Sequence, residues 1–258
     1  MAVVSIITIT YNAEKVLEKT MQSVLQQKNG SVEYVIVDGN SKDKTVEIIQ
    51  RFEKEIAEGK YPAVKSSDFR YISEPDKGLY DAMNKGMQMA TGDFVWFINA
   101  GDKIFDEHTV EKIENALRLN PSSDVVYGQS LMIGENDQPL GERHKIAPAN
   151  LKKKHLLRGL VVCHQSILVR KSIAPLYDLQ YRISADYDWT AKVLAVSKHN
   201  LFIDDYISRF MISGLSAQHR KKSWKERFCI MKKHFGLCRT LWAHFIIIMK
   251  YPFTRKYN

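Results

Sequence analysis

The feature that most constrains the fold is a run of β-branched and apolar residues at the start of the chain, VVSIITIT from Val3 to Thr10. So little polar alternation is typical of a strand that helices cover on both faces, as in parallel sheets. Residues 13–27 follow with Leu17, Met21 and Val24 at helical spacing. We therefore predict a buried strand and a helix here. A signal peptide is not expected, because no basic segment precedes the apolar run.

The same alternation of short apolar runs and amphipathic segments continues along the first half of the chain. It predicts strands at 34–37, 69–73, 94–98 and 124–133, helices at 44–55, 79–89 and 108–119, and a turn at 134–141. This pattern favours an α/β fold, with a Rossmann-like nucleotide-binding domain and a mostly parallel central sheet over residues 1–135. Later residues predict a helix at 150–158, a strand at 165–169, a helix at 185–196, an extended segment at 200–212 and a long helical segment at 222–251.

Composition limits the class of protein. The 258 residues suit one large α/β domain with a small appendage, and 45% hydrophobic residues exclude a disordered chain. Cys163, Cys229 and Cys238 are widely spaced, so they predict neither a disulfide framework nor a zinc knuckle, and they favour a reducing compartment.

The net charge of +9 is concentrated at the C-terminal end. From His219 onward the chain carries eleven Lys and Arg residues but one acid, Glu226, with aromatic residues at helical spacing such as Trp224, Trp242 and Phe245. A basic, aromatic helix suits the surface of an anionic membrane. The alternative is a helix pair that packs on the preceding domain. Nucleic acid is not expected as a partner, because no recognised nucleic-acid-binding module accompanies the charge. No stretch reaches the roughly 18 apolar residues of a spanning helix.

Polar residues follow four of the predicted strands. They are Thr10, Tyr11 and Asn12 after the first, Asp38 after the second, the segment Glu74 to Gly78 after the third, and Asn99 to Asp102 after the fourth. In open α/β sheets, ligands bind outside the carboxyl ends of the strands. The coincidence of four such ends predicts a binding site at that edge of the sheet.

In that order, the motifs TITYN, VDGNSKDKT, SEPDKGLYDAMNKGMQMATGD and FINAGD resemble family 2 glycosyltransferases with the GT-A fold. The similarity continues through CHQSILVRK, SADYDW and SGLS, and it is greatest to the bacterial subgroup that assembles capsular, exopolysaccharide or O-antigen sugars, such as colanic acid. The resemblance implies a glycosyltransferase domain over 1–218, with a nucleotide-sugar half at 1–135 and an acceptor half at 136–218. Residues 219–258 would form the basic helical tail.

The resemblance also implies which residues bind the nucleoside-diphosphate sugar donor. They are Thr10, Tyr11, Asn12, Asp38, Lys77, Asn84, Asn99 and Ala100. An aromatic face can stack a base, Asp38 can accept from its edge, and Lys77 is a point charge for the diphosphate. Two alternatives remain open: Asp38 as a helix-capping turn residue, and Asn84 as a solvated residue on a helix surface.

A metal ion is implied by the place of FINAGD in the pattern. The family usually carries a DxD-type motif that holds Mg²⁺ or Mn²⁺ against the donor diphosphate, and hard cations take carboxylate and phosphate oxygens. Here NAGD keeps one carboxylate, Asp102, where the DxD pattern has two. This chain therefore departs from the pattern in the residues that set its affinity for the metal. His219 is a second candidate contact, with a solvated loop histidine as the alternative.

The acceptor side is implied by SADYDW. Asp186 would be the general base that takes the proton of the acceptor hydroxyl, with Asp188 as the fallback and Ala185 in place of the usual glutamate. The alternative for Asp186 is an acid that favours a helix N-terminus. His164 and Gln165 would border the acceptor or sugar pocket, and residues 213–216 would form a loop that closes over the donor.

These motifs predict an inverting glycosyltransferase that acts on a saccharide or lipid-linked saccharide, at the cytoplasmic face of the membrane. No Ser/His/Asp or Cys/His constellation is present for a nucleophile. A nucleotidyltransferase would show a glycine- and arginine-rich phosphate loop, and a dinucleotide oxidoreductase would show GxGxxG after the first strand. A non-catalytic nucleotide or sugar-binding module stays open, because NAGD and SADYDW each lack one acid.

Overall fold

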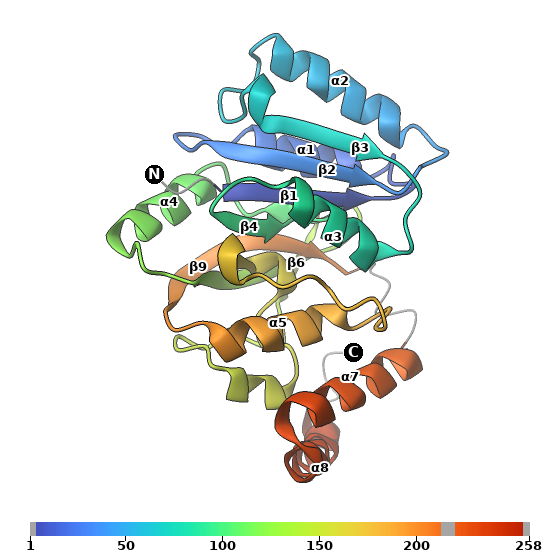
Figure 1. The fold of residues 1–258 in the computed structure, drawn as a ribbon, viewed down its shortest axis with the longest axis vertical. Helices are drawn as coiled ribbons and strands as arrows, with labels where there is room; N and C mark the ends of the chain where they lie inside the picture. Colours follow the sequence, from blue (N-terminus) through green and yellow to red (C-terminus); the bar gives the residue numbers. More distant parts are fainter. Residues whose placement is uncertain (1–3, 213–219, 255–258) are drawn as a thin grey trace.

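The computed structural model describes residues 4–212 and 220–254 (Figure 1). Within these residues, nine strands form one sheet in the order β3-β2-β1-β4-β8-β6-β9-β5, and β7 pairs with β6. The strands are β1 (Val4–Thr10), β2 (Val32–Asp38), β3 (Phe69–Ser73), β4 (Phe94–Phe97), β5 (Lys103–Ile104), β6 (Val125–Ile133), β7 (Pro139–Glu142), β8 (Ile167–Arg170) and β9 (Asn200–Met211). The α-helices are α1 (Leu17–Leu25), α2 (Thr45–Ala57), α3 (Leu79–Met89), α4 (Thr109–Leu119), α5 (Ala185–Val196), α7 (Arg220–Phe235) and α8 (Leu237–Thr254).

The four strands β1 to β4 are parallel, as the buried apolar runs predict. Strand β8 is antiparallel to both β4 and β6, while β6 and β9 are parallel to each other. Most strands therefore point the same way, and the predicted α/β fold with a mostly parallel sheet is confirmed. In the register of β1, β2 and β3, Thr10 lies beside Asp38 and Asp38 beside Ser73.

Two apolar cores cover the faces of this sheet. On β1, Ile6 packs in the core that α1, α2 and α4 complete, whereas Ile7 packs in the core of α3 and α5. In Figure 1, α3 and α5 lie in front of the sheet. Alternate side chains of a strand point to opposite faces, so burial on both sides requires an unbroken apolar run.

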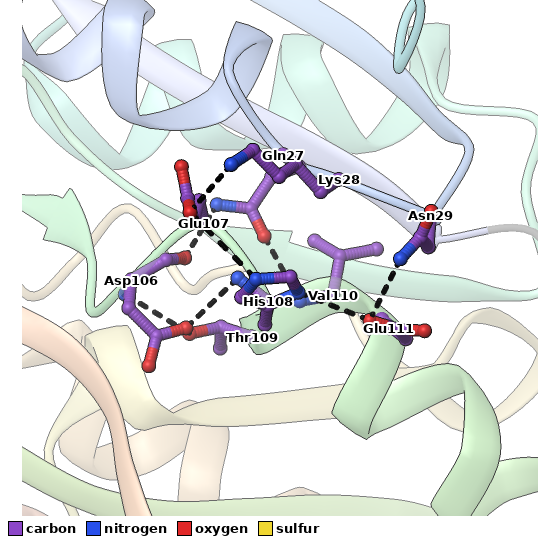
Figure 2. A network of polar contacts seen from close by, with 9 residues as sticks. All are labelled: Gln27, Lys28, Asn29, Asp106, Glu107, His108, Thr109, Val110 and Glu111. Atoms are coloured by element: carbon purple, nitrogen blue, oxygen red, sulfur yellow. Dashed lines mark hydrogen bonds and ion pairs between the residues drawn. The ribbon is translucent and has the colours of Figure 1, made fainter.

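The loop after α1 is bound to the start of α4 by a network of polar contacts (Figure 2). Buried Gln27 donates to the Asp106 carbonyl at 2.7 Å and accepts from the Val110 N–H at 2.9 Å. The Lys28 N–H donates to the Glu107 carbonyl at 2.7 Å. A side chain from another element thus satisfies an N–H in the first turn of α4, where no partner within the helix exists.

Several local predictions differ from the structure. The predicted helix at 150–158 is a short 3₁₀ helix, η2 (Lys153–Arg158), and the predicted strand at 165–169 begins as the 3₁₀ helix η3 (His164–Ser166) before β8. Strand β7 occupies part of the predicted turn at 134–141, and β5 was not predicted because a two-residue strand carries no periodicity. The tail is two helices rather than one, since Gly236 ends α7 in the left-handed conformation.

The first tail helix, α7, is docked on the segment before α5. Glu226 on α7 accepts hydrogen bonds from the backbone N–H groups of Arg182, Ile183 and Ser184, at 2.9 to 3.0 Å. These groups precede α5, where the positive end of the helix dipole favours a carboxylate. The alternative that the sequence left open, packing on the domain, therefore describes α7. Among the described residues, no helix combines the length and apolar character needed to cross a bilayer.

Gly86 brings helix α3 into close contact with β1. A Cβ atom at this position would lie within 3.0 Å of the Cγ2 methyl group of Ile7, which is completely buried. We expect Gly86→Val to lower the free energy of unfolding by about 1 to 3 kcal/mol, because the added carbons would overpack the core. Urea denaturation measures this change. The control Gln88→Ala, on the exposed side of the same helix, should leave it nearly unchanged, and equal midpoints for both variants would contradict the close packing.

Candidate active site

The buried carboxylate of Asp38 marks the edge of the sheet. It accepts hydrogen bonds from the Ser41 N–H at 3.0 Å, from the Ser41 hydroxyl, and from the Ser73 hydroxyl at 2.6 Å. A carboxylate offers about four acceptor positions, so these donors hold Asp38 in place and leave room for one more. The structure places Asp38 in the turn role that was its alternative, and its contact to a base remains a prediction.

Tyr11 and Asn12 form the exposed rim of this edge. The Tyr11 side chain is 63% exposed, and Asn12 takes a positive φ of 46° while its side chain accepts from the Lys42 N–H at 2.9 Å. A Cβ atom on Gly39 would lie 3.3 Å from the Tyr11 ring and 2.5 Å from Asp76 Oδ2. An exposed aromatic face and a carboxylate thus flank Gly39, an arrangement that can stack a base and accept from it. Sequence reasoning did not single out Asp76, although it lies inside the quoted SEPDKG motif.

Two buried oxygens nearby lack hydrogen-bond partners. They are Thr10 Oγ1, at the end of β1, and Asn99 Oδ1, after β4, and neither has a partner in the described part of the chain. Buried polar atoms are nearly always satisfied, so each such atom requires an explanation. Both belong to the predicted donor-binding set. Ala100 follows Asn99 and donates its N–H to the Ile9 carbonyl at 3.1 Å, which fixes this turn against β1.

Asp102 lies in the turn between β4 and β5, and its exposure is 5%. Its Oδ2 accepts from Gln165 Nε2 at 2.9 Å and its Oδ1 from the Met211 N–H at 3.0 Å. Burial raises the pKa of Asp102 to about 7, although these two hydrogen bonds favour the charged form. The Asp102 carboxylate thus joins the segment after β4, η3 and the end of β9, and Gln165 lies beside Asp102, while its contact to the acceptor or sugar remains a prediction.

A divalent metal ion fits this position in its chemistry. Mg²⁺ is often held by one or two carboxylates together with substrate phosphates. Asp102 supplies one carboxylate, and Asn99 supplies a buried amide oxygen without a partner. In the described ranges 4–212 and 220–254, no group of three His, Cys, Asp or Glu side chains could hold a metal. Donor phosphates would therefore have to complete the coordination. His219 and residues 213–216 lie outside the described residues.

Lys77 and Asn84 occupy different environments. Lys77 is exposed in the loop before α3, where its N–H donates to Asp81 Oδ2 at 3.0 Å. Asn84 is buried and pairs twice with the backbone of Tyr177, donating to its carbonyl at 3.0 Å and accepting from its N–H at 2.7 Å. The structure therefore gives Asn84 a positioning role, because it holds the segment before α5 against α3.

His164 lies in an aromatic cluster behind the site. Its Nε2 is 2.7 Å from the Tyr177 hydroxyl, and its ring packs against Phe97 and Trp189. Burial lowers the pKa of His164 to about 4, so the ring is neutral at pH 7. His164 therefore packs in the core beneath the site as a neutral side chain.

Asp186 lies in the first turn of α5. Its Oδ1 accepts from the Tyr187 N–H at 2.9 Å and from the Tyr80 hydroxyl at 3.3 Å, and no described residue bonds its Oδ2. Burial raises the pKa of Asp186, while the Tyr187 N–H and the charge of Arg227 partly offset this effect. A partly buried carboxylate with a raised pKa and one free oxygen suits a general base. Sequence reasoning missed Tyr80, which lies 106 residues away in the sequence.

Asp188 is completely buried and ion-paired. Its carboxylate lies 2.6 Å from Lys192 Nζ, 2.8 Å from His234 Nε2 and 3.4 Å from Lys233 Nζ. Burial alone would raise the pKa of Asp188, but the hydrogen bonds from His234 and Lys192 outweigh it and hold that pKa well below the usual range. Asp188 thus anchors α7 to α5, and of the two carboxylates Asp186 is the one with a free oxygen.

The raised pKa of Asp102 predicts a pH dependence of stability. Between about pH 4 and pH 7 the unfolded chain has lost this proton while the folded chain keeps it, so folding becomes less favourable as pH rises. We expect Asp102→Asn to stabilise the protein more at pH 8 than at pH 5, by about 3 kcal/mol, because the folded chain keeps the proton over about two of these pH units and each unit contributes about 1.4 kcal/mol. Urea denaturation at both pH values measures this difference. The control Asp204→Asn, an exposed acid, should show the same effect at both, and a pH-independent effect of Asp102→Asn would contradict the raised pKa.

Comparisons with solved structures agree with this geometry. Staphylococcus aureus TarS 1-349 in complex with UDP has a TM-score of 0.69 at 17% identity, with 99% of this chain and 73% of that chain covered. The mannosyltransferase PcManGT of Pyrobaculum calidifontis, in complex with GDP-Man and Mn²⁺, has a TM-score of 0.64 at 15% identity, with 94% and 70% covered. At these identities the likeness shows a common fold.

Sequence comparison identifies the family. A PGL/p-HBAD biosynthesis glycosyltransferase of Mycobacterium bovis (strain BCG / Pasteur 1173P2) is 32% identical over 194 residues, which cover 73% of this chain and 68% of the relative. The model of the family described as "Glycosyl transferase family 2" matches residues 5–174, from β1 past β8. The chain is therefore a member of glycosyl transferase family 2, and its sheet, strand-end residues and NAGD turn are parts of a glycosyltransferase.

Proposed function

We propose that this glycosyltransferase moves a sugar from a nucleoside-diphosphate sugar to a hydroxyl group of a saccharide acceptor, by one inverting displacement. The observation that carries the proposal is the Asp186 carboxylate, with its raised pKa and free Oδ2. As the acceptor oxygen bonds to the anomeric carbon and the bond to the diphosphate breaks, Asp186 takes the hydroxyl proton. The carboxylate is conjugate base to a weaker acid than an exposed aspartate, which makes it a better proton acceptor.

Donor binding is proposed at the carboxyl ends of β1, β2 and β4. Exposed Tyr11 would stack the base, and the remaining acceptor position of Asp38 would receive an N–H of its edge. The fold is shared with proteins solved in complex with UDP and with GDP-Man. These complexes support a pyrimidine or purine nucleotide at this edge, and the base and sugar are left to a donor panel.

Asp102 and Asn99 would hold Mg²⁺ or Mn²⁺ together with the donor phosphates. When bound, the ion would offset the negative charge that builds on the departing nucleoside diphosphate. The protein itself orients the Asp102 carboxylate, because the Gln165 side chain and the Met211 backbone N–H each donate a hydrogen bond to it. Loss of the Asp102 charge should therefore weaken donor binding without moving the sheet.

The acceptor is proposed to be lipid-linked, within the assembly of bacterial cell-surface polysaccharide. This step rests on the resemblance of the motifs and on the outer face of α8. Exposed apolar residues spaced three or four apart line that face: Leu237, Leu241, Trp242, Phe245 and Met249. Trp242 and Phe245 stack at 5.7 Å, and Trp242 is 64% exposed. In Figure 1, α7 and α8 form one end of the molecule, beyond α5.

An anionic membrane surface fits that end of the molecule. Exposed cations are also present on the same two helices, among them Lys222 and Lys225 on α7 and Arg239 on α8. Aromatic side chains bury apolar area at the headgroup boundary while lysine and arginine meet anionic lipids. Such a surface would keep the enzyme at the cytoplasmic leaflet, where a lipid-linked acceptor is held.

We expect Asp186→Asn to lower kcat by about 10²- to 10⁴-fold, the usual contribution of a positioned general base. Release of nucleoside diphosphate from a panel of nucleotide sugars, with a bacterial lipid-linked acceptor extract and Mg²⁺ or Mn²⁺, measures this loss. Calorimetry should show unchanged binding of the nucleoside diphosphate, because Asp186 contacts the acceptor. The control Asp68→Asn makes the same chemical change at η1 (Ser66–Asp68), at the opposite end of β3 from Ser73, where the Asp68 side chain bonds only Ser67, and it should keep full activity. A variant at position 186 with near wild-type kcat would exclude Asp186 as the base.

We expect the double variant Trp242→Glu/Phe245→Glu to bind vesicles with anionic lipid at least tenfold more weakly, since each aromatic residue contributes about 1.5 to 3 kcal/mol when buried. Flotation of the full chain with phosphatidylglycerol vesicles, at low and high salt, measures the binding. Leu119→Glu/Val196→Glu is the matched control, because both residues are exposed apolar positions on other helices. Equal flotation of the two double variants would contradict a membrane role for α8.

A further inference from the structure

Three cations gather around Gly159, which follows η2. Gly159 is buried and has a positive φ of 92°. The point where a Cβ atom would sit lies within 3.0 Å of both Lys145 Nζ and Arg227 Nη2. The ammonium and guanidinium groups therefore share the space above one glycine. Arg143 joins them from the same segment as Lys145, with its Nη2 donating to the Leu160 carbonyl at 3.4 Å.

None of the three cations forms an ion pair with a residue that the structure describes, whereas other buried charges, such as Asp188, do. Three acids line the same cavity as Arg143 and Lys145: Glu142, Asp204 and Asp205. Two of these acids have other partners, because Glu142 accepts from the Tyr206 hydroxyl and Asp205 pairs with Lys112. Arg227 instead lies 5.7 Å from the centre of the Tyr187 ring. Burial, together with the charges of Arg227 and Arg143, lowers the pKa of Lys145 to about 8. Like charges held together in half-buried positions are costly, so an anion would stabilise this arrangement.

The cluster lies beside the base. Arg227 is close enough to Asp186 for its charge to lower the pKa of that carboxyl, and it follows Glu226, whose three hydrogen bonds fix α7 on the start of α5. On the other side, the charge of Arg143 reaches buried Cys163, whose Sγ donates to Gln165 at 3.1 Å. Gln165 in turn bonds Asp102. The cluster thus acts on Asp186 through Arg227 and on Cys163, beside Gln165, through Arg143.

We propose that Arg143, Lys145 and Arg227 bind a phosphate group of the acceptor substrate next to Asp186. The proposal rests on the glycosyl transfer proposed above, and it narrows the acceptor to saccharides that carry a phosphate or diphosphate. A guanidinium can bind two phosphate oxygens in a fork, and an ammonium adds a compact charge beside it. Glycine at 159 keeps the space open for those oxygens, because any side chain there would meet both cations.

An acceptor phosphate fits better than the donor diphosphate. All three cations come from the chain after β7 and from α7, and none from the ends of β1 to β4, where the donor edge lies. The donor diphosphate has its own expected partners at Asn99 and Asp102. Asp186 must face the acceptor hydroxyl, and Arg227 is the cation whose charge acts on Asp186. A phosphate held by Arg227 would bring the attached saccharide within reach of the base.

The first test is a titration of inorganic diphosphate into the full chain after saturation with the nucleoside diphosphate that binds it most tightly. Saturation fills the donor site, so heat from diphosphate reports a second anion site. Lys145→Met and Arg227→Met should each weaken this second binding at least tenfold and leave nucleoside diphosphate affinity unchanged. Lys154→Met, an exposed lysine on neighbouring η2, is the matched control and should behave as wild type.

Two results would overturn the proposal. One is the absence of a second site in the wild-type protein. The other is a loss of nucleoside diphosphate affinity in both variants, which would assign the cations to the donor. Both variants remove a like charge from a crowded group, so their thermal unfolding should be no lower than that of the wild type. If one of them fails to fold, the other still decides the question.

A second test uses turnover with two synthetic acceptors, one saccharide with and one without an anomeric diphosphate ester. The two variants should raise KM at least tenfold for the phosphorylated acceptor and leave KM for the other unchanged. Equal effects on both acceptors would contradict phosphate recognition. The titration needs no turnover, so a failure of Asp186 as the base would be seen in kinetics alone and could not be mistaken for a failure of the anion site.

Discussion

The register of β1 against β2 is the constraint on which the site depends. Both strands are buried on both faces, so their apolar side chains alone would pack almost as well after a slip of one residue. Polar pairs decide the register. The buried Glu33 carboxylate accepts from the Ser5 hydroxyl, the Thr91 N–H at 2.7 Å and the Gly92 N–H at 3.3 Å, and Arg70 lies 3.0 Å from it. A slipped strand would leave that charge unpaired in the core, which is far costlier than a displaced methyl group. The same register sets Thr10 beside Asp38.

Desolvation separates three aspartates that the sequence presents as equals. Asp102 has two neutral donors and a raised pKa, Asp186 has a raised pKa with one free oxygen, and Asp188 is surrounded by cations that hold its pKa low. The roles proposed for Asp102 and Asp186, at the donor edge and in proton transfer, follow from these environments, and Asp188 attaches α7 to α5. Asp186 and Asp188 are two residues apart on one helix, so only the packing around α5 distinguishes them.

Much of the fold could be predicted from the sequence, because apolar periodicity reports burial directly. Helices α3 and α5 begin and end where the pattern predicts. The pattern also predicts which polar residues follow the strands and meet at one edge of the sheet. The same pattern could not report long-range partners. Asn84 looks like a surface amide in a helical wheel, yet it pairs with the Tyr177 backbone 93 residues away. Tyr80, Lys145 and Arg227 were missed for the same reason, since nothing local in their segments indicates that they approach Asp186 or Gly159.

Charge was also a poor guide to where the tail separates from the enzyme. The basic residues begin near 219, but α7 is attached through Glu226 to the backbone before α5 and through His234 to Asp188. A chain that ended before α7 would leave three amide N–H groups without an acceptor and a buried carboxylate without two of its partners, Lys233 and His234. Helix α7 therefore holds α5, the helix that carries the proposed base Asp186, in its place. Gly236 separates α7 from α8, and a force or a binding event that moves α8 would reach the rest of the protein both through that glycine and through the direct contacts of α8 with η2.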